Sequence, residues 1–123
     1  MIVTGSEGFI GKALCRELAK RDVEVIRTWS KSLVLKPQKV CELLKNGGID
    51  CVFHLAAQTS VFNGNLEQIR KDNIDTFMRV ADACNQYHVK LVYASSSNGE
   101  SGEYHFHVWN KQVFRWTVCI YLL

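Results

Sequence analysis

Three glycines stand near the start of the chain at intervals of three residues, in the stretch TGSEGFIG: Gly5, Gly8 and Gly11. A short apolar run, MIVTG, precedes them and an amphipathic pattern follows. Between a strand and a helix, such glycines permit a tight turn, close approach of a pyrophosphate to the backbone, and close packing of helix on sheet, in that order. The N-terminus of the helix would add unpaired N–H groups and a partial positive charge.

The glycine turn therefore predicts a binding site for the diphosphate of a dinucleotide, because the motif requires this strand–turn–helix context. The alternative is a structural turn that binds nothing. The residues expected to contact the cofactor are those of the turn itself: Gly5, Ser6, Gly8, Phe9, Ile10 and Gly11.

The elements that would position this turn are strands and helices in alternation. Apolar runs predict strands over residues 1–5, 23–28, 51–57 and 90–94. Apolar residues at helical spacing predict helices over residues 9–21, 37–46 and 66–88. Strands that alternate with helices form a parallel sheet with helices on both faces. We therefore expect a Rossmann-like, doubly wound α/β fold that binds its ligand at the carboxyl ends of the strands.

Four stretches together resemble the NAD(P)-dependent epimerase/dehydratase family, the extended branch of the short-chain dehydrogenase/reductase superfamily. VTGSEGFIG resembles its nucleotide-binding turn, and VFHLAAQTSV its H-x-A-A segment. DNIDTFMRVADAC resembles its N-V-x-G-T segment, with Asp75 where glycine is usual, and KLVYASSS its fifth strand. The resemblance implies a truncated Rossmann-like NAD(P)-binding domain over residues 1–98. Residues 99–123 are then a divergent tail that completes or caps the sheet.

Small residues after the third predicted strand are further candidates for cofactor binding. Leu55, Ala56 and Ala57 stand at a strand end, where alanines suit contact with a ribose or adenine; simple helix–sheet packing is the alternative. The resemblance implies that Asn73 holds backbone near the cofactor site, whereas an exposed helix residue is the plainer interpretation. His54 lies within an apolar strand, which favours a core histidine with a hydrogen-bond partner over a base or ligand.

The choice between NAD and NADP depends on the end of the second strand. An acid there would bind the ribose 2′-hydroxyl, but the stretch VEVIRTWSKS places none after the strand. Arg27, Ser30 and Lys31 stand there instead, and a guanidinium suits a phosphate. The short passage that follows resembles compact reductases of the family that prefer NADPH. We expect NADP rather than NAD, with Arg27 at the 2′ position, unless Arg27 is only a solvated edge residue.

The resemblance implies hydride transfer at a sugar carbon of a nucleotide-sugar, with a Tyr-x-x-x-Lys pair as acid/base and a serine after the fifth strand. Ser97 matches that serine, or is a turn residue. No tyrosine stands four residues before a lysine; His107 does so before Lys111, and Tyr104 stands seven before it. These residues are the remaining catalytic candidates. A diverged tail would instead leave a non-catalytic dinucleotide-binding or protein-interaction module.

Composition limits the other partners. The net charge of +3 is small and the basic residues are scattered, which argues against nucleic acid. No apolar run reaches the roughly 18 residues of a membrane-spanning helix. The five cysteines lack a C-x-x-C spacing, which favours free thiols in the cytoplasm over disulfides, and no metal site is expected. The resemblance also allows a homodimer through the helix over residues 66–88.

Overall fold

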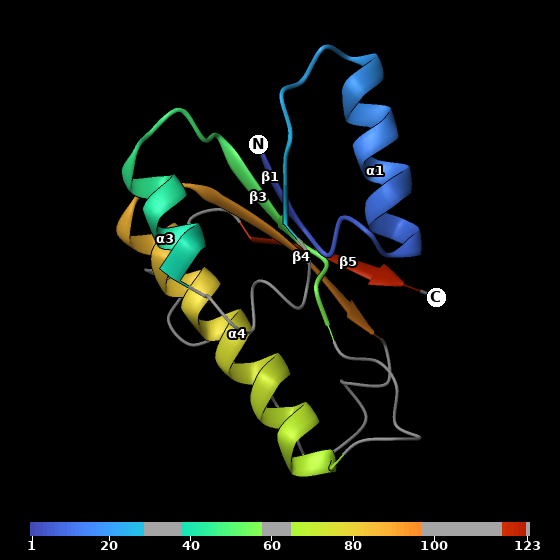
Figure 1. The fold of residues 1–123 in the computed structure, drawn as a ribbon, viewed down its shortest axis with the longest axis vertical. Coiled ribbons are helices and arrows are strands. Elements are labelled where there is room, and N and C mark those ends of the chain that lie inside the picture. The colour runs from blue at the N-terminus through green and yellow to red at the C-terminus, as the bar shows by residue number, and fades with distance from the viewer. Residues whose placement is uncertain (29–37, 58–64, 97–116, 123) are drawn as a thin grey trace.

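A parallel sheet of five strands, in the order β2-β1-β3-β4-β5, forms the centre of the fold (Figure 1). The computed structural model describes residues 1–28, 38–57, 65–96 and 117–122. The strands are β1 (Ile2–Thr4), β2 (Ile26–Thr28), β3 (Cys51–His54), β4 (Lys90–Ser96) and β5 (Thr117–Leu122). The helices are α1 (Phe9–Lys20), α3 (Gln38–Lys45) and α4 (Leu66–Gln86).

The order of the strands reverses at β1. The chain passes from β1 to β2 on one side, and then returns to β3 on the other side of β1. All of these pairs are parallel. The predicted doubly wound, Rossmann-like fold is therefore confirmed, and its switch point lies between the carboxyl ends of β1 and β3.

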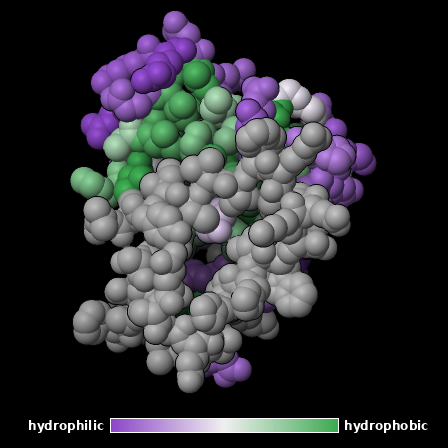
Figure 2. All heavy atoms as spheres, turned by 180° about the vertical axis from the view of Figure 1, so that it is seen from behind, coloured by the Kyte–Doolittle hydropathy of each residue, from purple (hydrophilic) through white to green (hydrophobic). Residues whose placement is uncertain are grey.

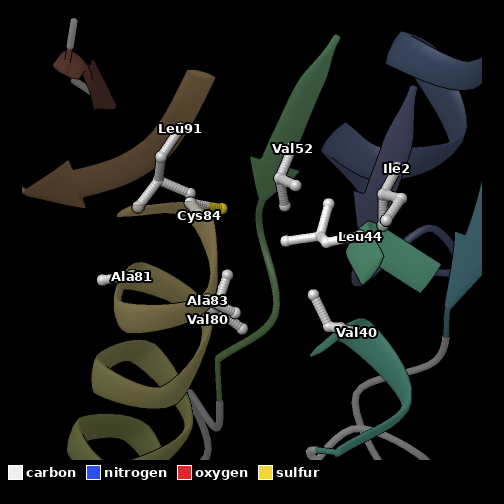
Figure 3. Packing of buried hydrophobic residues seen from close by; sticks show 9 residues of the cluster. All are labelled: Ile2, Val40, Leu44, Val52, Val80, Ala81, Ala83, Cys84 and Leu91. Atoms are coloured by element: carbon white, nitrogen blue, oxygen red, sulfur yellow. The ribbon is translucent and has the colours of Figure 1, made fainter. Parts of the chain in front are cut away.

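The core lies between the sheet and the helices α3 and α4. Ile2, Val52 and Leu91 occupy one row across β1, β3 and β4 and are at most 1% exposed. Figure 3 shows this row facing buried side chains of α3 and α4, among them Val40 and Val80. Each fully buried side chain of this size stabilises the folded protein by roughly 1.5–3 kcal/mol. Most of the buried hydrophobic residues described belong to this cluster, so this face forms most of the described core.

Helix α1 covers the opposite side of the strands (Figure 1). Gly11 and Cys15 form its buried face, and Leu14 and Leu18 are half-buried. Seen from behind, hydrophobic residues gather in the region where Figure 1 places α1, and hydrophilic residues lie above them (Figure 2). The buried and half-buried residues of α1 lie on one face of the helix, which is the amphipathic pattern predicted for residues 9–21. The helix ends one residue earlier than predicted, at Lys20.

Three predicted strands are shorter in the structure. β1 was predicted over residues 1–5 and spans Ile2–Thr4. The bounds of the other two follow from their partner strands. β2 was predicted from residue 23, but it begins at Ile26, because its partner β1 begins at Ile2 and the two residues pair. β3 was predicted to residue 57, but it ends at His54, where the paired strand β1 ends at Thr4. The residues 55–57 that follow belong to the candidate site.

The tail contributes one strand to the described structure. Thr117–Leu122 forms β5, which pairs in parallel with β4 from Leu91 to Ser96. The division of the chain at residue 98 remains a prediction. Within the described residues, none of the helices combines the length and the apolar character that crossing a membrane requires.

Candidate dinucleotide-binding site

The turn between β1 and α1 is held to the end of β2 by one carbonyl. Gly5 has φ +68°, a value that favours glycine, and its N–H donates to the Thr28 oxygen at 2.9 Å. The N–H and the hydroxyl of Ser6 also point at this oxygen, at 3.4 Å and 3.3 Å. Ser6 is 1% exposed, so its side chain serves the turn internally.

Two of the three glycines are required by close packing within the protein. A Cβ on Gly5 would lie 2.8 Å from the backbone of Leu55 and Ala56, which is too close for real atoms. A Cβ on Gly11 would lie 2.2 Å from the Gly5 oxygen. We expected Gly11 to allow packing of the helix on the sheet; the nearest atoms belong to Gly5 and Ser6, so it allows packing of the helix on the turn instead.

Gly8 differs from the other two glycines. Its φ of −71° suits any residue, and a Cβ there would meet only the Gly5 oxygen, at 3.3 Å. Gly8 is exposed and is the N-cap residue of α1, without a side-chain hydrogen bond to cap the helix. A Cβ here would require the Gly5 oxygen to give way by a few tenths of an ångström, which is a weaker constraint than those at Gly5 and Gly11. The exposed position leaves the backbone of Gly8 accessible from outside the protein.

The first turn of α1 offers free hydrogen-bond donors. Among the described residues, the N–H groups of Phe9, Ile10 and Gly11 have no acceptor, whereas the Gly8 N–H donates to the Gly5 oxygen at 3.0 Å. Phe9 is 93% exposed and Ile10 38%. Free N–H groups at a helix N-terminus, together with the helix dipole, favour a bound anion such as phosphate.

A chain of hydrogen bonds joins the ends of β1 and β3 beside this turn. The Ala56 N–H donates to the Thr4 hydroxyl at 3.2 Å, and the Leu55 N–H donates to the Thr4 carbonyl at 3.2 Å. The Thr4 hydroxyl lies 2.9 Å from Nδ1 of His54. The turn after β1 and the segment after β3 are therefore fixed to one another at the switch point.

His54 is buried and neutral. Burial lowers the pKa of its imidazole from 6.5 to about 4. The centroid of its ring lies 5.8 Å from that of Phe77. The Phe77 and Tyr93 rings have centroids 4.9 Å apart and meet in an edge-on arrangement. His54 thus has the hydrogen-bond partner expected of a core histidine, and at neutral pH it is a poor source of a proton.

The other predicted site residues lie farther along the elements. Arg27 is exposed on β2, one residue before Thr28, and pairs in register with Val3. Asn73 is half-buried on α4, four residues before Phe77 and hence on the same face of the helix. The four predicted catalytic residues lie outside the described residues; they are Ser97, Tyr104, His107 and Lys111. Ser30 and Lys31 also lie outside the described residues.

Sequence reasoning missed two residues of the site, Thr4 and Thr28. Thr28 acts through its carbonyl, for which side-chain chemistry gives no signal. Thr4 gives one local signal, its place directly before the glycine turn, but its pairing with His54 depends on the register of the sheet.

Thiols and metal ligands supply no further site in the described part of the chain. Cys15, Cys41, Cys51 and Cys84 carry free thiols, as expected. Burial raises the pKa of the Cys84 thiol to about 12, so it stays protonated. No group of three potential metal ligands gathers among the residues described.

Fold and turn together define the class of the protein: it is a doubly wound α/β protein of the Rossmann type, with a glycine turn at the switch point. The chain belongs to the NAD dependent epimerase/dehydratase family, which matches residues 1–106. The resemblance carried by the four sequence stretches is thereby confirmed. The family uses a nicotinamide dinucleotide for epimerase, dehydratase and reductase reactions.

Similar proteins are much longer than this chain. A Bacillus subtilis (strain 168) protein named uncharacterized UDP-glucose epimerase YtcB is 29% identical, over 80% of this chain and 40% of its own length. UDP-glucose 4-epimerase from Brucella ovis in complex with NAD has a TM-score of 0.71 at 18% identity, over 82% of this chain and 37% of the epimerase. A dTDP-4-dehydrorhamnose reductase from Bacillus anthracis in complex with NADP has a TM-score of 0.63 at 27% identity, over 77% of this chain and 35% of the reductase. The chain spans less than half the length of each.

We predict that Gly5→Ala destabilises the fold more than Gly47→Ala. Both glycines have positive φ, +68° and +78°, so alanine has a similar backbone cost at each. Only at Gly5 does the new Cβ meet backbone; at Gly47 nothing lies within 4 Å. Gly5→Ala should therefore lower the free energy of unfolding, measured in urea, by about 1–3 kcal/mol more than Gly47→Ala does, which is the usual range for overpacking. Equal losses would show that the close approach to Leu55 and Ala56 is absent.

We also predict that the fold loses stability in acid because of His54. Between pH 6.5 and about 4, the unfolded chain binds a proton at His54 that the folded chain does not. The free energy of unfolding then falls as the pH falls, by about 1.4 kcal/mol per pH unit and about 3 kcal/mol in total. Urea midpoints measured across this range should fall more steeply for the unaltered chain than for His54→Asn.

His88→Asn is the matched control for this measurement. His88 is exposed, and its φ of 55° is a value that asparagine tolerates. The control should keep the full acid dependence of the unaltered chain. An acid dependence of His54→Asn as steep as that of the control would contradict the assignment.

Proposed function

We propose that the chain binds NAD(P) with the diphosphate at the N-terminus of α1. The observation that carries the proposal is the set of free N–H groups on Phe9, Ile10 and Gly11 beside the bare backbone of Gly8. The Thr28 carbonyl and the segment after β3 hold this turn in place before any ligand arrives. A site fixed in advance loses less entropy on binding, which supports a binding role for the turn.

The rest of the dinucleotide would extend along the carboxyl ends of the strands. Ala56 and Ala57, which follow β3, are small enough to lie against a ribose, and Leu55 and Asn73 are further proposed contacts of the cofactor. Arg27 would approach the adenosine 2′ position. The residues that directly follow β2 include no acid, which supports NADP over NAD as the preferred cofactor.

The reaction of the whole protein would be hydride transfer between nicotinamide and a sugar carbon of a nucleotide-sugar, as an epimerase, dehydratase or reductase. The name of the Bacillus subtilis relative supports this substrate class. Ser97 directly follows β4 and would bind the substrate oxygen, with Tyr104 or His107 and Lys111 as acid/base candidates. We place the protein in the cytoplasm, with a homodimer through α4 as a further part of the proposal.

A second candidate is a dinucleotide-binding or protein-interaction module without turnover. The observation that favours it is the sequence after Ser97, in which no tyrosine stands four residues before a lysine. The two candidates share the glycine turn and differ in whether a nucleotide-sugar is converted. An epimerase or a dehydratase returns the hydride to the sugar and leaves the dinucleotide unchanged overall, whereas a reductase oxidises it. Chromatography of the products formed from UDP-glucose and dTDP-sugars, together with nicotinamide absorbance for a reductase, separates the two candidates.

We predict that Gly8→Asp abolishes dinucleotide binding and keeps the fold. Aspartate is a favourable N-cap residue, better than glycine by about a few tenths of a kcal/mol, and the φ of −71° accommodates it. Its carboxylate would repel the diphosphate by about 4 kcal/mol at contact distance, enough for a loss of more than hundredfold in affinity. Titration with NADPH and NADH, followed by nicotinamide fluorescence, measures the affinity, and thermal unfolding measures stability.

Two control variants isolate the charge at the turn. Gly8→Asn has the same shape without the charge and should weaken binding less. Gly47→Asp adds the same charge in open space and should bind as the unaltered chain does. Equal affinity of Gly8→Asp and Gly47→Asp for NADPH would contradict a diphosphate at this turn. Absence of binding of either dinucleotide to the unaltered chain would overturn the proposed function altogether.

A further inference from the structure

The hydrogen-bond chain at the ends of β1 and β3 begins in the interior, at His54. The ring nitrogen Nδ1 of His54 lies 2.9 Å from the Thr4 hydroxyl oxygen, which accepts the Ala56 N–H at 3.2 Å. Thr4 is 0% exposed and His54 is 6% exposed. Water therefore has little access to these groups, and each must find its partner within the protein.

The donors and acceptors of the two side chains favour one placement of the protons. The Thr4 hydroxyl has one proton to donate, and its oxygen is already the acceptor for Ala56. If Nδ1 of His54 donated to this oxygen, the buried hydroxyl proton would have no acceptor among the described residues, at a cost of about 1–3 kcal/mol. Thr4 therefore donates to Nδ1, and the neutral imidazole carries its proton on Nε2.

This arrangement fixes the rotation of the Thr4 hydroxyl, and with it the segment after β3. With the proton on the side of His54, a lone pair of the oxygen faces Ala56. The backbone of Leu55 and Ala56 is then held so close to Gly5 that a Cβ on Gly5 would lie only 2.8 Å from it. The ring of His54 is itself held by Phe77, which links it to α4.

We propose that His54 is a positioning residue of the dinucleotide site, acting through the Thr4 hydroxyl to fix residues 55–57 against the glycine turn. His54 does not touch the dinucleotide in this proposal. The inference rests on the proposed function, because it assigns residues 55–57 to cofactor contact. It adds a requirement for one imidazole tautomer, which the cofactor contacts alone do not demand.

Thr28 supplies the matched control. It occupies the same row of the sheet as Thr4 and is 4% exposed, but its hydroxyl oxygen has no hydrogen-bond partner among the residues that the structure describes. Thr4→Val and Thr28→Val therefore make the same change in shape at neighbouring buried positions. Only the first removes hydrogen bonds, so a difference between them reports the chain from His54 to Ala56.

The experiment compares the full chain with Thr4→Val, Thr4→Ser and Thr28→Val. Hydrogen exchange of the Ala56 amide reports the segment after β3, and long-range ¹H–¹⁵N spectra of the imidazole report the tautomer of His54. In Thr4→Val, we expect exchange at Ala56 to speed up and the affinity for NADPH to fall, each by about tenfold or more. Thr4→Ser, which keeps the hydroxyl, should restore both. Thr28→Val, which keeps the carbonyl that holds the turn, should exchange the Ala56 amide as slowly as the unaltered chain does.

Three results would overturn the positioning role while the proposed function stands. A His54 imidazole with its proton on Nδ1 in the unaltered chain contradicts the proton assignment, and this spectrum needs no variant. Unchanged exchange at Ala56 in folded Thr4→Val shows that the hydroxyl does not hold the segment. Faster exchange at Ala56 with unchanged NADPH affinity shows that the segment is held but does not serve the site. If the unaltered chain binds neither dinucleotide, the proposed function fails, and the positioning role fails with it.

Discussion

The structure depends on one close approach, between the turn after β1 and the segment after β3. No side chain separates them, because a Cβ on Gly5 would lie 2.8 Å from the backbone of Leu55 and Ala56. This close approach joins the ends of β1 and β3 at the switch point of the sheet. It also fixes the position at which the chain begins α1. The N–H groups at the start of α1 are directed by this turn, so the arrangement that we propose to bind an anion depends on the absence of a Cβ at Gly5.

The sheet changes from core to site within two residues. On the face covered by α3 and α4, the row of Ile2, Val52 and Leu91 is apolar. Two residues later on the same strands, the row of Thr4, His54 and Tyr93 is polar. Thr4 and His54 remain buried, so their polar atoms need partners inside the protein, and they find them in each other and in the backbone of the segment after β3. Burial thus stabilises the core, and it also requires the polar groups beside the candidate site to form hydrogen bonds that fix their positions.

Much of the fold and part of the site follow from the sequence alone. The glycine spacing within a strand–turn–helix pattern predicts the turn, and the alternation of elements predicts the parallel sheet. The end of β3 could not be predicted, because VFHLAAQ stays apolar beyond His54, and the strand ends only where β1 turns away at Gly5. The role of Thr4 depends on which strands are neighbours and in what register, which no local pattern contains. The contribution of Thr28 is a backbone oxygen, and every residue has one.

The account is tested most directly by the backbone amide resonances of Phe9, Ile10 and Gly11 during a titration with NADPH. If the diphosphate binds at the N-terminus of α1, these resonances shift together, saturate at the same concentration as the nicotinamide fluorescence, and shift in the same direction with inorganic pyrophosphate. Saturable NADPH binding that leaves these amides unmoved while others shift would contradict the account.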